Sequence, residues 1–236
     1  MSGIHGLIFD KDGTLFDFRA TWSAWARQFF MELSAGSETL AARLGQAVGF
    51  NMEDGTFVPD SPIIAGTPAE ISMHLLEHVP GADRATLVAR MNAVSAETRQ
   101  VAAVPLVPLF EGFTARGLKL GLATNDAEEP ATAHLRQAGV ASFFHFVSGY
   151  DSGYGAKPDP GPLLAFARMH GLAPGTVAMV GDSLHDLIAG RAAGMRTVAV
   201  LTGIAGADAL SPLADVVLTD IGHLPDWIDS QAMAET

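Results

Sequence analysis

Two aspartates separated by one residue, Asp10 and Asp12, follow a short apolar run near the N-terminus. On a turn that leaves a strand, one carboxylate can act as a nucleophile while the other transfers protons. Gly13 permits a tight turn, and the hydroxyl of Thr14 can stabilise that turn. An ordinary Asp-Gly turn accounts for this motif alone about equally well, so its meaning depends on the other polar groups of the chain.

A second acidic pair, Asp182 and Asp186, follows another apolar run. Their spacing of four residues places both side chains on the same side of a helix start. Together with Asp10 they supply oxygen ligands that suit a hard cation, and Mg²⁺ usually takes one or two carboxylates plus water and phosphate oxygens. Asp182 could instead serve only as a helix N-cap. His185, between these acids, is predicted to lie on the helix surface rather than to bind a ligand.

A lysine in a stiff loop and a Thr-Asn pair complete the polar set. Lys157 precedes a Pro-Asp-Pro segment, which restricts where the lysine can point. Since lysine occurs only three times in the chain, one in such a loop indicates more than surface charge. Thr124 and Asn125 also follow an apolar run, and their hydroxyl, amide and backbone N–H groups can bind phosphoryl oxygens. The alternative for this pair is an ordinary strand-to-helix turn.

These polar groups fall at the ends of apolar runs that alternate with helical patterns. Strands are predicted over 4–9, 118–123, 177–180, 197–201 and 215–218, and helices between them over 129–138, 161–170 and 184–193. This alternation indicates an α/β fold, a Rossmann-like parallel sheet with helices on both faces. Ligands bind at the carboxyl ends of the strands in such sheets, so the polar groups are predicted to converge there.

The segment 17–100 shows a different pattern, without a convincing strand. It predicts three or four amphipathic helices, near 20–34, 38–48, 67–79 and 83–100. We therefore expect an all-α cap domain over 17–100, inserted after the first strand of an α/β core formed by 1–16 and 101–236. The links between the two are predicted near Asp17 and over 102–108.

Composition excludes several classes of protein. The formal net charge of −12 makes nucleic acid and anionic membrane surfaces poor partners. The absence of cysteine excludes disulfides, zinc–thiolate sites and thiol nucleophiles. The N-terminus does not resemble a signal peptide, and no stretch approaches the roughly 20 apolar residues of a membrane helix. A cytoplasmic protein is expected, and its oligomeric state is not indicated.

The polar groups, taken in order along the chain, resemble the four motifs of the haloacid dehalogenase superfamily. Within it, the chain is similar to the phosphoglycolate-phosphatase-like branch, which carries a helical cap after the first strand. The motifs are Asp10-x-Asp12-Gly13-Thr14, Thr124-Asn125, Lys157-Pro158-x-Pro160 and Gly181-Asp182-Ser183-x-x-Asp186.

The resemblance implies a role for each acid. Asp10 would attack phosphorus and form an aspartyl-phosphate, and Asp12 would protonate the leaving alcohol and then deprotonate the hydrolytic water. Mg²⁺ would be held by Asp10, by the backbone carbonyl of Asp12 and by Asp182. Asp186 would bind the ion directly or anchor a metal-bound water.

The resemblance also implies how a small phosphorylated metabolite would bind. Thr124 and Asn125 would hold the phosphoryl group, and Lys157 would neutralise it together with Asp10. The cap would set specificity, and Arg19, just beyond the first link, is the best-placed cation to meet a second anionic group of the substrate. Alternatives in the cap are Arg27, Arg43, His74, Arg84 and Arg90.

The predicted function is a Mg²⁺-dependent phosphatase acting on a small phosphomonoester, phosphoglycolate-like or a sugar phosphate. The first alternative is a sugar phosphomutase of the same family, which uses a histidine early in the cap to manage the second aspartate. Because no histidine occurs between His5 and His74, hydrolysis is favoured. A non-catalytic phosphate-binding protein is the second alternative, and the complete set of carboxylates argues against it.

Overall fold

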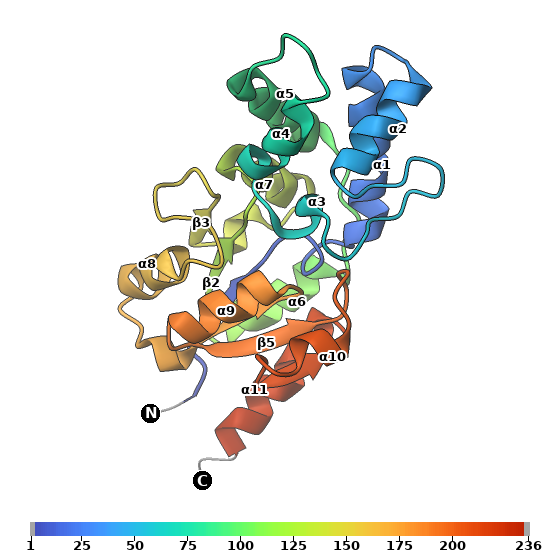
Figure 1. The fold of residues 1–236 in the computed structure, drawn as a ribbon. Coiled ribbons are helices and arrows are strands. Elements are labelled where there is room, and N and C mark those ends of the chain that lie inside the picture. The colour runs from blue at the N-terminus through green and yellow to red at the C-terminus, as the bar shows by residue number, and fades with distance from the viewer. Residues whose placement is uncertain (1–2, 234–236) are drawn as a thin grey trace.

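The computed structural model describes residues 3–233. Figure 1 shows an α/β body with a group of helices, α1 to α5, set over one end of its sheet. Within the described residues, no helix is both long enough and apolar enough to span a membrane.

Six parallel strands form the sheet in the order β3-β2-β1-β4-β5-β6. Phe9, the last residue of β1, pairs with Leu122 of β2 on one side and with Val180 of β4 on the other. The chain builds outward from β1 to β3 and then returns to β4, so ligands are expected where the carboxyl ends of β1 and β4 meet. The strands are β1 (Gly6–Phe9), β2 (Lys119–Ala123), β3 (Phe146–Ser148), β4 (Val177–Gly181), β5 (Arg196–Val200) and β6 (Val216–Leu218).

Helices cover both faces of the sheet, which explains why its central strands are apolar throughout. Leu7 and Phe9 face one hydrophobic cluster, whereas Ile8 faces another on the opposite side. The first cluster includes α6 (Leu106–Ala115), α7 (Glu128–Gln137) and α11 (Leu224–Met233); the second includes α8 (Gly161–Met169) and α9 (Leu184–Ala192). Short helices lie at Ala207–Leu210 (α10), Ala141–Phe143, Pro174–Thr176 and Ile221–His223. The predicted α/β fold is confirmed.

The helices between β1 and α6 pack around a hydrophobic cluster of their own, whose buried side chains all come from residues 18–91. Aromatic rings dominate it: the rings of Trp25 and Phe29 stack with centroids 5.0 Å apart and planes 6° apart. This segment, here called the helical insertion, comprises α1 (Phe18–Leu33), α2 (Glu38–Ala47), α3 (Pro62–Ala65), α4 (Pro68–Leu76) and α5 (Arg84–Glu97).

Side-chain caps determine where the insertion helices begin. The Asp17 carboxylate accepts a hydrogen bond from the backbone N–H of Ala20, at 2.8 Å, and so starts α1. Thr67 and Glu70 form a reciprocal capping box at the start of α4. Asp83 caps α5. The predicted helix starts at Thr67–Pro68 and Asp83 are confirmed.

Two segments that run side by side connect the sheet to the insertion. The backbone N–H of Asp17 donates to the carbonyl of Val101 at 2.8 Å, and that of Ala103 donates to the carbonyl of Leu15 at 2.9 Å. The two links are therefore held together at one place, so any movement of the insertion would turn about this pair.

Sequence reasoning missed β3, α6 and α11. Strand β3 has three residues, too few for a periodic signal. Helix α6 begins at Leu106, within the segment 102–108 that was expected to be an irregular link. That prediction is wrong for residues 106–108. Pro108 in that stretch is compatible with a helix because it lies in the first turn, where its missing N–H would have no intrahelical acceptor.

Candidate active site

The carboxyl ends of β1 and β4 bring three carboxylates together. Asp10 continues the pairing of β1 with β4, since its backbone N–H donates to the carbonyl of Val180 at 2.8 Å. Asp10, Asp182 and Asp186 each offer an oxygen, and these atoms lie within 4.8 Å of one another. Oxygen donors this close and this charged fit a hard divalent cation.

Burial disfavours the ionised forms of the acids in this cluster. Burial raises the pKa of Asp10 from 3.8 to about 7, although Lys157 opposes the shift. The pKa of Asp182 is raised well above its ordinary value by burial and by the neighbouring charges of Asp10 and Asp186. Because the ionised forms lack full compensation from the protein alone, the site favours a bound cation.

The carboxylate of Asp182 packs against two glycines that no larger residue could replace without a clash. A Cβ at Gly13 or at Gly203 would overlap its carboxylate, and Gly13 also has a positive φ of 75°. The Thr14 hydroxyl donates to Asp182 at 3.3 Å. The alternative that Asp182 is only a helix cap is wrong, because Ser183 occupies the N-cap of α9.

Asp186 has partners on both of its oxygens. Its Oδ1 accepts from Lys157 Nζ at 2.6 Å, and its Oδ2 accepts from the backbone N–H and hydroxyl of Ser183 at 3.0 and 2.7 Å. The bond from the Ser183 backbone N–H is one half of the capping box that starts α9, and the N–H of Asp186 donates to the Ser183 hydroxyl oxygen in the other half. Asp186 therefore positions Lys157 and the start of α9. Asp10 and Asp182 accept fewer hydrogen bonds from the described residues, so their oxygens are more available to a cation.

Lys157 is buried and lies between two acids. Its Nζ is 2.6 Å from Asp10 Oδ1 as well as from Asp186. Burial disfavours its charge, but the two carboxylates outweigh burial and raise its pKa. Lys157 is thus a permanent cation beside Asp10.

Asn125 positions this lysine. Its side-chain amide donates to the carbonyl of Lys157 at 2.8 Å, and its carbonyl oxygen accepts from the N–H of Lys157 at 2.9 Å. The amide also donates to Ala65 of the insertion at 2.8 Å. The Asn125 side chain is therefore committed to backbone groups, while neighbouring Thr124 lines the pocket and accepts from the N–H of Asp126 at 3.1 Å.

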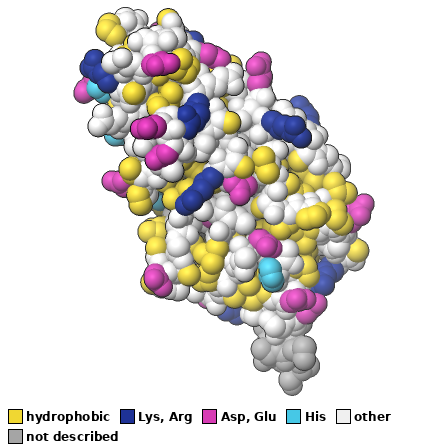
Figure 2. Space-filling view, turned by 90° about the vertical axis from the view of Figure 1, so that its right-hand side faces the viewer, with side chains coloured by type: hydrophobic (Ala, Val, Ile, Leu, Met, Phe, Trp, Pro, Cys, Tyr) yellow, Lys and Arg dark blue, Asp and Glu magenta, His cyan; other side chains and the backbone are white. Residues whose placement is uncertain are grey.

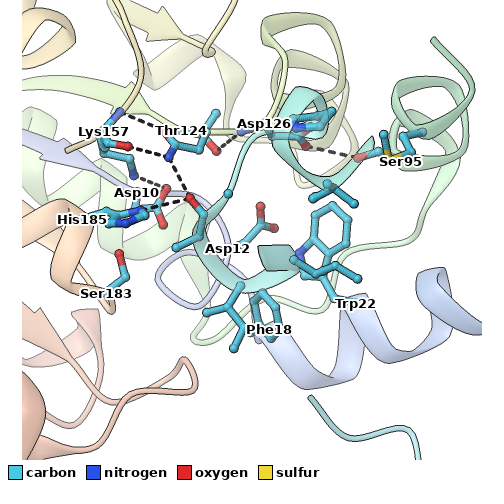
Figure 3. Close-up of a pocket in the computed structure, with 18 of the residues that line it drawn as sticks. Asp10, Asp12, Phe18, Trp22, Ser95, Thr124, Asp126, Lys157, Ser183 and His185 are labelled. Atoms are coloured by element: carbon cyan, nitrogen blue, oxygen red, sulfur yellow. Dashed lines mark hydrogen bonds and ion pairs between the residues drawn. The ribbon is translucent and has the colours of Figure 1, made fainter. Parts of the chain in front are cut away.

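Sequence reasoning missed a buried network behind Asp12. Lys11 Nζ lies 2.7 Å from Asp12 and 3.3 Å from Asp126, and its side chain is fully buried. Burial disfavours the charge of Lys11, but the two acids outweigh it and raise its pKa. Ser95 of α5 donates to Asp126 at 3.1 Å, as Figure 3 shows. The scarcity of lysine, with one standing between two aspartates, is the signal that could have identified this network.

His134 completes the network. Its Nδ1 lies 3.0 Å from Lys11 Nζ, and its Nε2 lies 2.7 Å from the carbonyl of Ser95. A carbonyl only accepts, so Nε2 carries the proton and Nδ1 accepts from the lysine. Burial and then Lys11 lower the pKa of His134 to about 4, so it is neutral at pH 7.

A pocket lies between the sheet end and the insertion (Figure 3). Its volume is about 50 Å³. From the α/β body come polar groups, and from the insertion come mainly apolar ones. The polar lining residues of the α/β body are Asp10, Asp12, Thr124, Asn125, Asp126, Lys157, Ser183 and His185, and those of the insertion are Asn92 and Ser95.

Comparisons with known proteins agree with this geometry. The family model described as haloacid dehalogenase-like hydrolase matches residues 4–194. The chain belongs to this family. It is 37% identical to a phosphoglycolate phosphatase from Rhodospirillum rubrum over 120 residues, which span 51% of this chain and 50% of that enzyme. It is 28% identical to the phosphoglycolate phosphatase of Escherichia coli K12 over 237 residues, 94% of this chain and 91% of that enzyme.

Solved structures share the fold of this hydrolase. A protein from Haemophilus somnus described as a predicted phosphoglycolate phosphatase superposes with a TM-score of 0.72 at 17% identity, covering 96% of this chain and 98% of its own. A β-phosphoglucomutase from Clostridium difficile gives 0.65 at 15% identity, covering 98% and 99%. The family and its sequence relatives together make this hydrolase a phosphatase of the phosphoglycolate-phosphatase-like branch.

Two residues of this hydrolase lie elsewhere than predicted. Arg19 is exposed on α1 and is not among the residues that line the pocket. His185, expected on the helix surface, is half-buried and lines the pocket, with its Nδ1 3.2 Å from the carbonyl of Ala65. Ala65 of the insertion contacts His185 of α9 and so helps to bury it, whereas Arg19 lies on the exposed side of α1. The spacing of residues along the chain predicts neither position.

Replacing Lys11 with Met should lower the free energy of unfolding by about 3 kcal/mol, because removing one partner of a buried ion pair leaves Asp12 and Asp126 uncompensated. Urea unfolding of both proteins measures the difference. Lys119→Met is the matched control, since Lys119 is exposed at the start of β2 and should change stability by less than about 0.5 kcal/mol. Equal stability of the Lys11→Met and Lys119→Met proteins would contradict the buried pair.

A divalent cation should stabilise the protein more at pH 8 than at pH 5.5. The pKa of Asp10 is about 7 when folded against an ordinary value of 3.8, so its protonation favours the folded state and this contribution is lost as the pH rises through 7. A cation restores the loss by binding the ionised carboxylates. The measurement is the thermal midpoint with Mg²⁺ and with EDTA at both pH values.

The control for this pH dependence is the Asp10→Asn protein, in which the difference between the two pH values should shrink. An equal cation-induced shift at pH 5.5 and pH 8 in the unaltered protein would contradict the role of the buried acids.

Proposed function

We propose that the protein is a Mg²⁺-dependent phosphatase that hydrolyses a small phosphomonoester through an aspartyl-phosphate on Asp10. The observation that carries this proposal is that Lys157 Nζ lies 2.6 Å from one oxygen of Asp10. Oxygens of Asp10 and Asp182 also lie within 4.8 Å of each other, close enough to bind the same cation. A carboxylate that is fixed on one side by a cation and faces a pocket is poised to attack an electrophile.

Charge decides whether such an attack is possible. A carboxylate and a phosphoryl oxygen at contact repel by about 4 kcal/mol per pair of unit charges at an effective dielectric constant of ~20. Lys157 opposes this repulsion from one side. A bound Mg²⁺, held by Asp10 and Asp182 with Asp186 behind them, would supply the remaining positive charge at the phosphoryl oxygens.

The chain's own residues would divide the reaction between two steps. In the first, an Asp10 oxygen bonds to phosphorus as the bond to the alcohol breaks, and Asp12 gives its proton to the departing oxygen. In the second, Asp12 takes a proton from water, whose oxygen displaces Asp10 from phosphorus. Lys11, 2.7 Å from Asp12, would hold Asp12 in place in both steps. Thr124, which lines the pocket, would bind phosphoryl oxygens.

Substrate access requires movement of the helical insertion. The pocket volume of about 50 Å³ is well below the roughly 300 Å³ at the lower end of ligand sites. We assign residues 17–100 to a cap domain and residues 1–16 and 101–236 to the core, with the paired links as the hinge. Closure would exclude bulk water around the reacting groups.

The Asp10→Asn protein should release no phosphate and accumulate no covalent phosphate, because an amide is not a nucleophile. Asp12→Asn should reduce kcat by about 10²- to 10⁴-fold, the usual size of a general acid–base contribution. Phosphate release and mass spectrometry of the intact chain measure both. The matched control is Asp208→Asn, since Asp208 is exposed and outside the pocket. A normal rate for Asp10→Asn would place the nucleophile elsewhere.

A paired assay separates hydrolase from mutase and from a binding protein. Phosphate release from small esters with Mg²⁺ is expected, without a bisphosphate activator, and EDTA should abolish it. Interconversion of glucose 1-phosphate and glucose 6-phosphate should be negligible. No histidine occurs in α1 to restrain Asp12 from the cap, as a mutase requires. Fast interconversion with little phosphate release would establish the mutase, and binding without turnover would establish the binding protein.

A further inference from the structure

The insertion side of the pocket is mainly apolar. Phe18 and Trp22 lie beside Asp12 in Figure 3, and Trp22 is also close to Lys11, whose Nζ is 5.5 Å from its ring centroid. Any group attached to a phosphate at Asp10 would extend toward this wall. The apolar lining residues from the insertion are Phe18, Trp22, Trp25, Ile63, Ile64, Ala65, Pro68, Ile71 and Met91.

Three buried polar atoms of residues on this wall have no hydrogen-bond partner among residues 3–233. They are the indole Nε1 of Trp22, the indole Nε1 of Trp25 and the side-chain carbonyl oxygen of Asn92. All three residues line the pocket. Since buried polar groups are rarely left unpaired, two donors and one acceptor gathered at one pocket indicate a ligand that pairs with them.

The part of the insertion wall that the structure describes offers no lysine or arginine to the pocket. Among the described residues that line the pocket, Lys157 is the only lysine or arginine, and it already pairs with Asp10 and Asp186. Three aspartates, Asp10, Asp12 and Asp126, line the pocket instead. A second anionic group on the substrate would therefore be buried next to acids without a partner.

The cations expected to bind such a group lie outside the pocket. Arg27 is the one that is half-buried, and it donates to the backbone carbonyls of Met52 and Glu53 within the insertion. Figure 2 shows the lysine and arginine side chains of one face standing singly on the outer surface. The other five, all exposed, are Arg19, Arg43, His74, Arg84 and Arg90.

From these observations we infer that the substrate is the phosphate ester of an uncharged, hydroxyl-bearing alcohol, a polyol or sugar, with Trp22, Trp25 and Asn92 as the specificity residues. Hydroxyl groups can accept from the two indole N–H groups and donate to the Asn92 carbonyl, and the C–H face of a polyol or sugar packs against an indole ring. A carboxylate-bearing ester such as phosphoglycolate is disfavoured. This inference rests on the proposed phosphatase function.

The test compares two esters that differ at one carbon. Glycerol 3-phosphate ends in a neutral CH₂OH group where 3-phosphoglycerate carries a carboxylate. With Mg²⁺, kcat/KM for glycerol 3-phosphate should exceed that for 3-phosphoglycerate by about 100-fold. The hydroxyl group of the first ester can pair with the indole N–H groups, whereas the carboxylate of the second would lie beside the aspartates that line the pocket. The opposite preference would overturn the inference.

Variants test the three residues through the ratio of the two kcat/KM values, which does not depend on how much protein folds. Trp22→Phe and Trp25→Phe keep a ring but remove the N–H, and each should lower the ratio by about tenfold. Trp227→Phe is the matched control, because Trp227 packs in the sheet core on α11. Asn92→Arg should bring a cation to the wall and shift the ratio toward 3-phosphoglycerate. An unchanged ratio in all three pocket variants would overturn the assignment of these residues.

A third substrate, p-nitrophenyl phosphate, separates failure of this inference from failure of the proposed function. If it is hydrolysed while 3-phosphoglycerate is preferred over glycerol 3-phosphate, the phosphatase proposal stands and the inference falls. If none of the three esters releases phosphate, the proposed function falls and the inference falls with it.

Discussion

The structure depends on the balance between buried carboxylates and buried lysines at the end of the sheet. Five acids, Asp10, Asp12, Asp126, Asp182 and Asp186, gather around two lysines, Lys11 and Lys157. An isolated buried charge is strongly unfavourable, so each lysine must lie within contact of at least two acids. The acids still outnumber the lysines, and this excess is what a divalent cation would neutralise.

The two lysines have different positions in this balance. Lys157 contacts Asp10 directly and is held by Asn125, so it lies beside the atom that would be phosphorylated. Lys11 lies on the far side of Asp12, away from the acid cluster, and contacts Asp126 and His134. Lys157 therefore pairs with the proposed nucleophile, Asp10, and Lys11 pairs with the proposed acid–base residue, Asp12. The two carboxylates thus have different electrostatic surroundings although they are only two residues apart in the chain.

The helical insertion is part of the same balance. Ser95 of α5 contacts both Asp126 and His134, and the carbonyl of Ala65, the last residue of α3, accepts from Asn125. The groups that position the lysines are thus bonded to the insertion as well as to the sheet. The contacts that hold the insertion against the sheet end are therefore also contacts of the groups that position both lysines.

The sequence by itself determined the parallel α/β fold, the helical insertion and the position of most candidate residues in the site. Strand ends followed by Asp10, Thr124 and Asp182 are local patterns, and parallel strands necessarily bring their carboxyl ends to one edge. Lys157 was identifiable because lysine is rare and its loop is stiff. Short or proline-containing elements such as β3 and α6 were missed because their local signals are weak.

Only the tertiary structure decided how the side chains share their partners. Lys11 and His134 are 123 positions apart in the chain, and no local spacing could pair them. The same holds for Asn125 with Ala65, for His185 at the pocket and for the outward direction of Arg19. Local sequence sets where a turn or helix begins, whereas the packing of the insertion against the sheet sets which buried polar groups meet. The apolar, cation-free wall that bears on the substrate is a result of that packing.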